Sequence, residues 1–123
     1  MMKDLYCYRA IIKRIIDGDT FVVDIDCGFR NWIIGEKIRL YGINTPEIRT
    51  KDKEEKAKGL ISKAEVVKML PNNTEIIIQT YIDKNKDGFG RILATVWKGE
   101  LNINDWLVER GLAKIDNGRK KEV

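Results

Sequence analysis

Oxygen-bearing side chains crowd two turns of this sequence, and their types suit a hard metal ion. Asp19 lies in the Asp-Gly-Asp-Thr segment at residues 17–20, while Asn44, Thr45 and Glu47 surround a single proline. A hard cation prefers several oxygen ligands, and the second turn offers an amide oxygen, a backbone carbonyl and a carboxylate. Ordinary turn formation is the simpler explanation of both segments, because Asp, Asn and Gly are common turn residues.

Two arginines lie in predicted strands of the same chain. Ile38 and Leu40 share one face of a strand, so Arg39 between them points to the opposite face. Arg91 follows Gly-Phe-Gly at residues 88–90, and glycines on both sides of an aromatic residue suggest close approach of a backbone or a ligand. A solvated surface charge is the alternative for each arginine.

The absence of histidine narrows the chemistry that these residues can perform. The chain has 123 residues, no histidine and a net charge of +4, from 23 Lys and Arg against 19 Asp and Glu. Serine–histidine–aspartate hydrolysis, histidine-pair ribonuclease chemistry and histidine-rich metal sites are therefore excluded. Catalysis would use carboxylates, Arg, Lys, Tyr, Cys or a hard metal ion. The basic excess favours anionic partners but is too small to identify one.

Alternating and β-branched patterns predict that most of the chain forms strands. Residues 7–16, 20–27 and 36–43 have strand character, and their short connections predict an antiparallel meander. Two further strands are expected at 74–81 and 89–97.

Helical spacing predicts two helices that cover the strands. The first spans 53–70, and Asn102 is the expected N-cap of a second, short helix with Gly111 at its C′ position. The first helix is expected to bury an apolar stripe, with charges on the opposite side. This stripe consists of Ala57, Leu60, Ile61, Ala64 and Val67.

The order of these elements indicates an α+β, mainly β fold. Five short strands with a helix between the third and the fourth are typical of the OB-fold, a five-stranded Greek-key barrel, here with two packed helices. The length fits a single domain over 1–123, with a core at about 7–115 and a polar tail at 116–123. Such a fold does not by itself identify a function.

The cysteine content and the apolar pattern bear on the cellular compartment. Cys7 and Cys27 are too few for a disulfide framework or a cysteine-only zinc site. The N-terminal segment lacks the pattern of a signal peptide, and no apolar run is long enough to cross a membrane. We therefore expect a cytoplasmic protein with reduced thiols, with a secreted mature form and a disulfide between the two cysteines as alternatives.

Four segments, in order, resemble the staphylococcal nuclease (thermonuclease-like) family. They are IIDGDT, RLYGINTPE, DGFGR and LVERGLAK, and the resemblance covers residues from about 10 to about 115. Separated motifs in the right order on matching elements are far more specific than any one of them. The family fold is an OB-type barrel with packed helices, in agreement with the predicted elements.

The resemblance implies a calcium site. Asp19 looks like the family's metal-binding carboxylate, and Thr45 would add its backbone carbonyl. Asn44 stands where the best-known members have a second metal-binding Asp. The site then has one negative charge fewer, and its expected affinity for Ca²⁺ is lower.

The resemblance also implies a nuclease. Glu47 looks like the catalytic carboxylate, which takes a proton from the attacking water or positions that water. Arg39 and Arg91 look like the paired arginines that bind the scissile phosphate, whose shape a guanidinium fork matches. Members hydrolyse single-stranded DNA or RNA and generally leave a 3′-phosphate and a 5′-hydroxyl.

Contacts to the rest of the substrate depart from the family pattern. Phe89 stands where well-known members have Tyr, so it keeps a stacking face without the hydroxyl. The family's third helix and its base-stacking tyrosines have no counterpart after Lys114. Lys51 and Lys53, in the charged loop 49–53, are expected to guide a polyanionic substrate, with a solvated loop as the alternative.

Two functions of different classes therefore compete. The leading expectation is a Ca²⁺-dependent nuclease that acts as a monomer on DNA, RNA or both. The alternative is a catalytically weak or inactive OB-fold module that binds nucleic acid or a protein. Asp19, Arg39, Glu47 and Arg91 together favour the enzyme, because a pure binding module needs no metal-ligating carboxylate at the mouth of the barrel.

Overall fold

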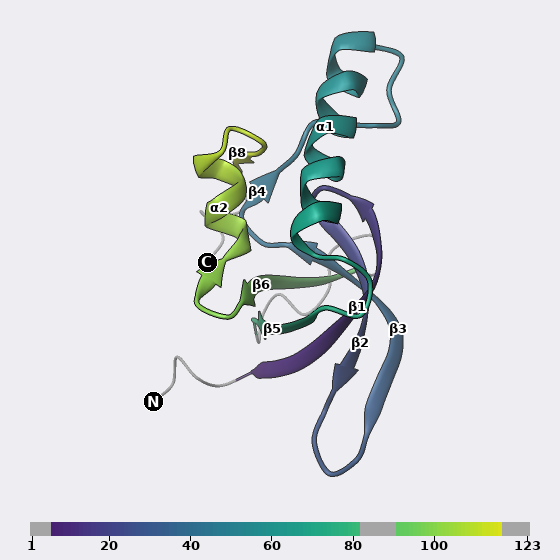
Figure 1. Ribbon diagram of the computed structural model, residues 1–123, viewed down its shortest axis with the longest axis vertical. Helices are drawn as coiled ribbons and strands as arrows, with labels where there is room; N and C mark the ends of the chain where they lie inside the picture. Colours follow the sequence, from purple (N-terminus) through teal and green to yellow (C-terminus); the bar gives the residue numbers. More distant parts are fainter. Residues whose placement is uncertain (1–5, 82–90, 117–123) are drawn as a thin grey trace.

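The computed structural model describes residues 6–81 and 91–116, which form a barrel with two helices packed against it (Figure 1). The first three strands pair as the predicted antiparallel meander. The third of them begins at Trp32 rather than at residue 36 and ends at Leu40. The bounds of these strands are Cys7–Asp17 for β1, Thr20–Asp26 for β2 and Trp32–Leu40 for β3.

Two later strands, β5 (Glu75–Thr80) and β6 (Ile92–Lys98), close the barrel. β5 pairs antiparallel with both β1 and β6. β6 then pairs in parallel with the end of β3, where Ile38 lies opposite Ile92. This closure confirms the predicted five-stranded, OB-type α+β fold.

Three very short strands were not predicted. β4 (Ile43–Asn44) pairs with β8 (Lys114–Ile115), and β7 (Leu101–Asn102) extends the edge of β6. The β4–β8 pair joins the chain just before Thr45 to the segment that follows the second helix. It therefore ties the start of the predicted site loop to a distant part of the sequence.

Alternating side chains of the strands fill the interior of the barrel. On β2, Phe21, Val23 and Ile25 point inward, as their spacing predicts. The helices add Leu70 and Leu107 to the same core. The largest fully buried side chains are Phe21, Ile12, Ile38, Leu40, Leu70, Ile76, Ile78, Ile103 and Leu107.

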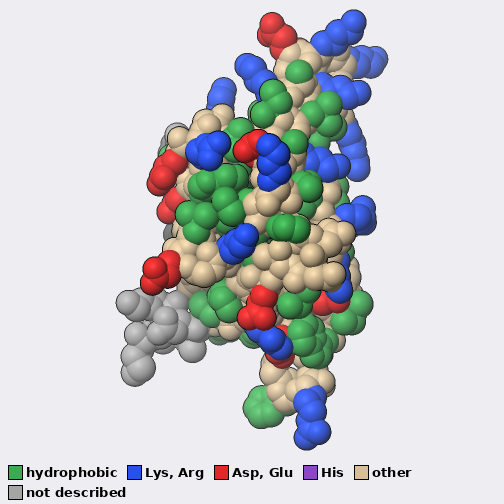
Figure 2. All heavy atoms as spheres, viewed as in Figure 1, with side chains coloured by type: hydrophobic (Ala, Val, Ile, Leu, Met, Phe, Trp, Pro, Cys, Tyr) green, Lys and Arg blue, Asp and Glu red, His purple; other side chains and the backbone are tan. Residues whose placement is uncertain are grey.

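The prediction of which face α1 (Lys53–Met69) buries is wrong. Leu60, Ile61 and Val67 are 48%, 57% and 45% exposed. The two alanines of the predicted stripe, Ala57 and Ala64, are exposed as well. Hydrophobic side chains accordingly appear on the surface of this helix among its lysines (Figure 2).

Small residues line the face of α1 that packs on the barrel. Gly59, Ser62 and Val66 are buried. A Cβ on Gly59 would lie 2.7 Å from the carbonyl oxygen of Pro46, and the Ser62 hydroxyl donates a 2.7 Å hydrogen bond to the carbonyl of Leu112. Backbone lies close to this face at Gly59 and Ser62, so small side chains fit at these two positions, while Val66 packs into the core further along the helix.

The caps of the second helix lie where they are predicted. At the start of α2 (Ile103–Glu109), the side chain of Asn102 accepts a 3.0 Å hydrogen bond from the amide of Asp105. Gly111 follows the helix with φ of 72°, a left-handed conformation that glycine adopts without strain. The carboxylate of Asp52 caps α1 in the same way.

Cys7 and Cys27 do not form a disulfide with each other. Over the ranges 6–81 and 91–116, we find no helix whose length and hydrophobicity would let it cross a membrane.

Candidate active site

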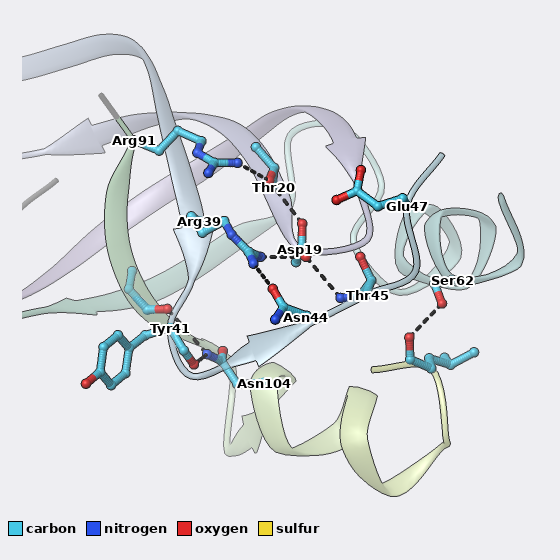
Figure 3. A network of polar contacts seen from close by, with 12 residues as sticks. Asp19, Thr20, Arg39, Tyr41, Asn44, Thr45, Glu47, Ser62, Arg91 and Asn104 are labelled. Atoms are coloured by element: carbon cyan, nitrogen blue, oxygen red, sulfur yellow. Dashed lines mark hydrogen bonds and ion pairs between the residues drawn. The ribbon is translucent and has the colours of Figure 1, made fainter. Parts of the chain in front are cut away.

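A polar cleft of about 540 Å³ opens where the β1–β2 turn meets β3 and the loop after β4. It brings together Asp19, Arg39, Glu47 and Arg91, which come from four separate parts of the chain (Figure 3). Arg39 and Arg91 lie on or beside the two strands whose parallel pairing closes the barrel. The cleft is lined by Ile16, Asp17, Asp19, Thr20, Lys37, Arg39, Glu47, Arg49 and Arg91.

The carboxylate of Asp19 is held in place by its surroundings. Asp19 is only 8% exposed, in the turn between β1 and β2, and its own carbonyl accepts a 2.9 Å bond from the amide of Leu40. Its Oδ2 accepts a 3.0 Å bond from the amide of Thr45, and its Oδ1 lies 3.1 Å from the donor Oγ1 of Thr20. The carboxylate is therefore oriented by Thr20 and Thr45, while Leu40 fixes the backbone of Asp19.

Arg39 is buried, so the alternative of a solvated outer-face charge does not hold. It is 6% exposed, and its Nη1 forms an ion pair with Oδ2 of Asp19 at 2.5 Å. Its Nη2 donates a hydrogen bond to Oδ1 of Asn44. A buried cation is costly unless it is paired, and Asp19 provides the compensating charge here.

Glu47 is exposed, and its side chain points into the cleft toward Asp19 (Figure 3). The loop that carries it rests on α1, because Gly59 lets the carbonyls of Pro46 and Glu47 approach the helix closely. The amide of Glu47 also donates a 2.8 Å bond to the carboxylate of Glu55 on α1. The helix thus sets the position of this carboxylate.

Arg91 enters the cleft from the start of β6. Its Nη1 lies 3.5 Å from Oγ1 of Thr20, the same hydroxyl that donates to Asp19. The two predicted arginines therefore flank Thr20 and Asp19: Arg39 contacts Asp19, and Arg91 contacts Thr20 (Figure 3). Phe89, the predicted stacking residue, lies outside the described residues.

Comparison with known proteins identifies the family of this chain. Residues 37–122 match the family model described as staphylococcal nuclease homologue. The chain belongs to the staphylococcal nuclease family.

Relatives support the same family over most of this chain. The thermonuclease of Staphylococcus intermedius is 34% identical over 104 residues, which are 85% of this chain and 57% of the relative. The thermonuclease of Staphylococcus hyicus is 33% identical, with 87% and 57% covered. An uncharacterized protein of Methanocaldococcus jannaschii is 30% identical, with 88% and 59% covered. The chain therefore spans little more than half the length of these relatives.

The oxygen donors expected of this family are present, but protein groups already use the side-chain oxygens of Asp19 and Asn44. Asp19, Asn44 and the carbonyl of Thr45 are oxygen ligands of the kind that Ca²⁺ prefers. Within 6–81 and 91–116, however, no three Asp, Glu or Cys side chains lie close enough to hold a metal ion together. The donor types fit a hard cation, and Arg39 competes with that cation for the side-chain oxygens of Asp19 and Asn44.

The cleft also contains charged residues outside the predicted catalytic and metal-binding set, one of them from the charged loop 49–53. Lys37 and Arg49 line it together with Asp17. Lys37 precedes Arg39 by two positions on β3, and this spacing alone puts both on one strand face. Lys51 and Lys53 are exposed and do not line the cleft, so their contact with substrate stays a prediction.

Proposed function

We propose that this protein is a nuclease that hydrolyses phosphodiester bonds of DNA or RNA in single-stranded or unpaired regions. One observation carries the proposal: a single cleft gathers Asp19, Arg39, Glu47 and Arg91. The family supports the same activity, since two of the relatives are thermonucleases. The products would carry a 3′-phosphate and a 5′-hydroxyl.

The two arginines would bind the scissile phosphate. Hydrolysis places extra negative charge on the phosphate oxygens in the transition state, and fixed guanidinium groups stabilise that charge without reorganising. Each guanidinium can donate two parallel hydrogen bonds to a phosphate. Arg39 is already ordered by Asp19 and Asn44, so it loses little side-chain entropy when substrate arrives.

Glu47 would act as the general base. Its carboxylate lies in the cleft and is exposed, so it can reach a water molecule beside a bound phosphate. Water then attacks phosphorus, Glu47 takes its proton, and the bond from phosphorus to the 5′ oxygen breaks. The 5′ oxygen takes a proton from solvent and leaves as the 5′-hydroxyl. Such proton transfer contributes about 10²–10⁴-fold to a rate.

We further propose that the activity depends on Ca²⁺, held by Asp19, Asn44 and the carbonyl of Thr45. A bound cation supplies Lewis-acid stabilisation of the charge that develops on the phosphate. Replacing Asn44 by Asp adds a charged ligand and should raise the affinity for Ca²⁺, measured by calorimetry. Unchanged affinity and unchanged cleavage rate would mean that Asn44 is not a ligand.

We also propose a monomer that acts in the cytoplasm. Cys7 and Cys27 are not bonded to each other, which suits a reducing compartment.

The deciding experiment compares cleavage of single-stranded DNA, single-stranded RNA and duplex DNA by the purified protein, with Ca²⁺ or with a chelator. We expect cleavage of the single strands in Ca²⁺, little in chelator, and 3′-phosphate ends on the products. The matched variant Glu47→Gln keeps the shape of the side chain and should lower the cleavage rate at least about a hundredfold. Its thermal unfolding serves as the control for folding.

If the protein cleaves none of these substrates with any divalent cation, the proposed nuclease function is wrong. Binding of single strands without cleavage would instead favour the inactive OB-fold module. Asn44 is the feature that favours this second function, since it leaves Asp19 as the single carboxylate among the proposed metal ligands.

A further inference from the structure

We propose that Lys37 and Arg49 form additional phosphate sites in the cleft, which bind the strand on either side of the scissile phosphate. The inference rests on the proposed nuclease function and names two residues that bind the backbone beside the scissile phosphate. Lys37 comes from β3, and Arg49 comes from the loop that carries Glu47.

The charges of the cleft suit a polyanion. Among the residues that line it are four cations and three carboxylates. Asp19 is compensated by its ion pair with Arg39. Asp17 and Glu47 also face the cleft, yet neither forms an ion pair with Lys37 or Arg49. The two cations are therefore available for an anion that arrives from solution.

Lys37 and Arg49 have no polar partner among the described residues, unlike several other exposed cations. Across residues 6–81 and 91–116, neither side chain makes a hydrogen bond or an ion pair. By contrast, Arg9 pairs with Asp26, and Lys13 pairs with Asp24. Both cleft residues are exposed, so binding a phosphate would cost little desolvation.

Their positions suit successive phosphates along one strand. On β3, Lys37 lies opposite Val22 of β2, and Arg39 lies opposite Thr20. The two cations are two residues apart, so they share one face of β3 and are separated by about 6.6 Å along it. Arg49 follows Glu47 by two residues on the opposing loop. One phosphate would be satisfied by Arg39 and Arg91. The cations beyond them therefore suit phosphates on either side.

The test measures binding of a fluorescently labelled, single-stranded oligothymidylate in chelator, over a range of salt concentrations. The variants are Lys37→Met, Arg49→Gln and the double variant. Exposed cations outside the cleft supply the controls Lys56→Met and Arg30→Gln, which remove the same charge. We expect each single cleft variant to bind about two- to fivefold more weakly. The slope of log affinity against log salt should fall by about one for each cation removed.

Cleavage provides a second arm of the test. The ratio of kcat/KM for a long single strand to that for a substrate with one phosphodiester bond should fall about fivefold in the double variant. Both control variants should leave this ratio unchanged. If the wild-type protein cleaves nothing, the proposed nuclease function is wrong. The binding measurement in chelator still decides whether Lys37 and Arg49 bind a nucleic-acid strand.

Three results would overturn the inference. One is an unchanged salt slope in the double variant, and another is an equal loss of binding in the controls. The third is equal binding of polyglutamate of matched length with the same loss in the variants, because the cleft would then recognise any acidic chain.

Discussion

At the scale of the residue, Arg39 has two tasks that depend on its shape as well as its charge. It neutralises the buried Asp19, and it donates to the neutral acceptor Asn44. A lysine in its place could neutralise Asp19 but could not hold both partners with a planar fork. The guanidinium is therefore required for the geometry of the site, while any cation satisfies the charge.

This distinction predicts different outcomes for two substitutions. Arg39→Lys should lower kcat about a hundredfold or more, since one set of fixed donors to the phosphate is lost, with a small change in unfolding free energy. Arg39→Met should also destabilise the fold by about 3–5 kcal/mol, because Asp19 is left as an uncompensated buried charge. Steady-state kinetics and urea unfolding measure the two effects. Near-normal turnover of the Lys variant would rule out the proposed binding of the scissile phosphate by Arg39.

At the scale of the element, α1 positions the loop that carries Glu47 through a contact that allows no side chain. Gly59 lies under the carbonyls of Pro46 and Glu47, where an added Cβ would be 2.7 and 3.0 Å from the two oxygens. Glycine in a helix costs about 1 kcal/mol relative to alanine. Here that cost is offset by the close approach of the loop.

We therefore predict that Gly59→Ala lowers both stability and kcat, against the helix-propensity trend. The backbone atoms that the methyl group meets cannot turn away, so the loop and the Glu47 carboxylate must move. The matched control is Ala64→Gly on the exposed face of the same helix. It should lose about 1 kcal/mol and keep its kcat. A stabilised Gly59→Ala variant with normal activity would contradict the positioning role of α1.

The β2–β3 hairpin carries a pH-dependent contact. The Gly28 amide donates a 2.9 Å bond to Asp26, and Arg9 forms a 3.0 Å ion pair with it. Both contacts hold the pKa of Asp26 below its ordinary value, and the hydrogen bond from the Gly28 amide has the larger effect. The ionised form is therefore stabilised more in the folded than in the unfolded chain.

The sign of the shift sets the expected pH dependence. A lowered carboxyl pKa contributes stability that is present above the ordinary value of 3.8 and is lost as the pH falls through the lowered folded value. The wild-type protein should thus melt above Asp26→Asn at neutral pH, and the difference should shrink in acid. Thermal unfolding of both proteins from neutral to acidic pH measures it. A difference that does not change with pH would exclude the charge of Asp26 as its cause.

At the scale of the whole molecule, Asn104 joins parts of the chain that the barrel brings together. It is buried at the start of α2, and its Oδ1 accepts a 3.0 Å bond from the amide of Val96 on β6. Its Nδ2 donates to the carbonyls of Tyr41 and Ala94. One amide side chain therefore links α2, β6 and the chain that follows β3.

We predict that Asn104→Ala destabilises the protein by at least about 2 kcal/mol, because buried backbone groups lose their hydrogen-bond partners. The neighbouring Asn102→Ala removes an exposed N-cap and should cost about 1 kcal/mol. Urea unfolding compares the two. Equal losses would mean that the three buried bonds of Asn104 add nothing beyond a helix cap.

Local patterns were enough to predict most of the elements and to select four residues that the structure brings to one cleft. Alternation on β2, the caps at Asn102 and Gly111, and the motifs around Asp19 depend on residues that are neighbours in sequence. The meander follows from short turns between strands. These features could be predicted because the interactions that specify them act within a few residues.

Only the tertiary structure decided what each element faces. The apolar stripe of α1 predicts burial, but backbone carbonyls of the site loop and of Leu112 approach the other side of that helix, where Gly59 and Ser62 fit. Strand alternation assigns Arg39 to the outer face, but it is buried there against Asp19 and against Asn44 of β4. The parallel closure of β3 on β6 likewise brings Lys37 and Arg91 into one cleft. Burial and ion pairing depend on groups that are distant in the chain, so the sequence by itself determined the candidate chemistry, and the closed barrel decided which of these groups meet.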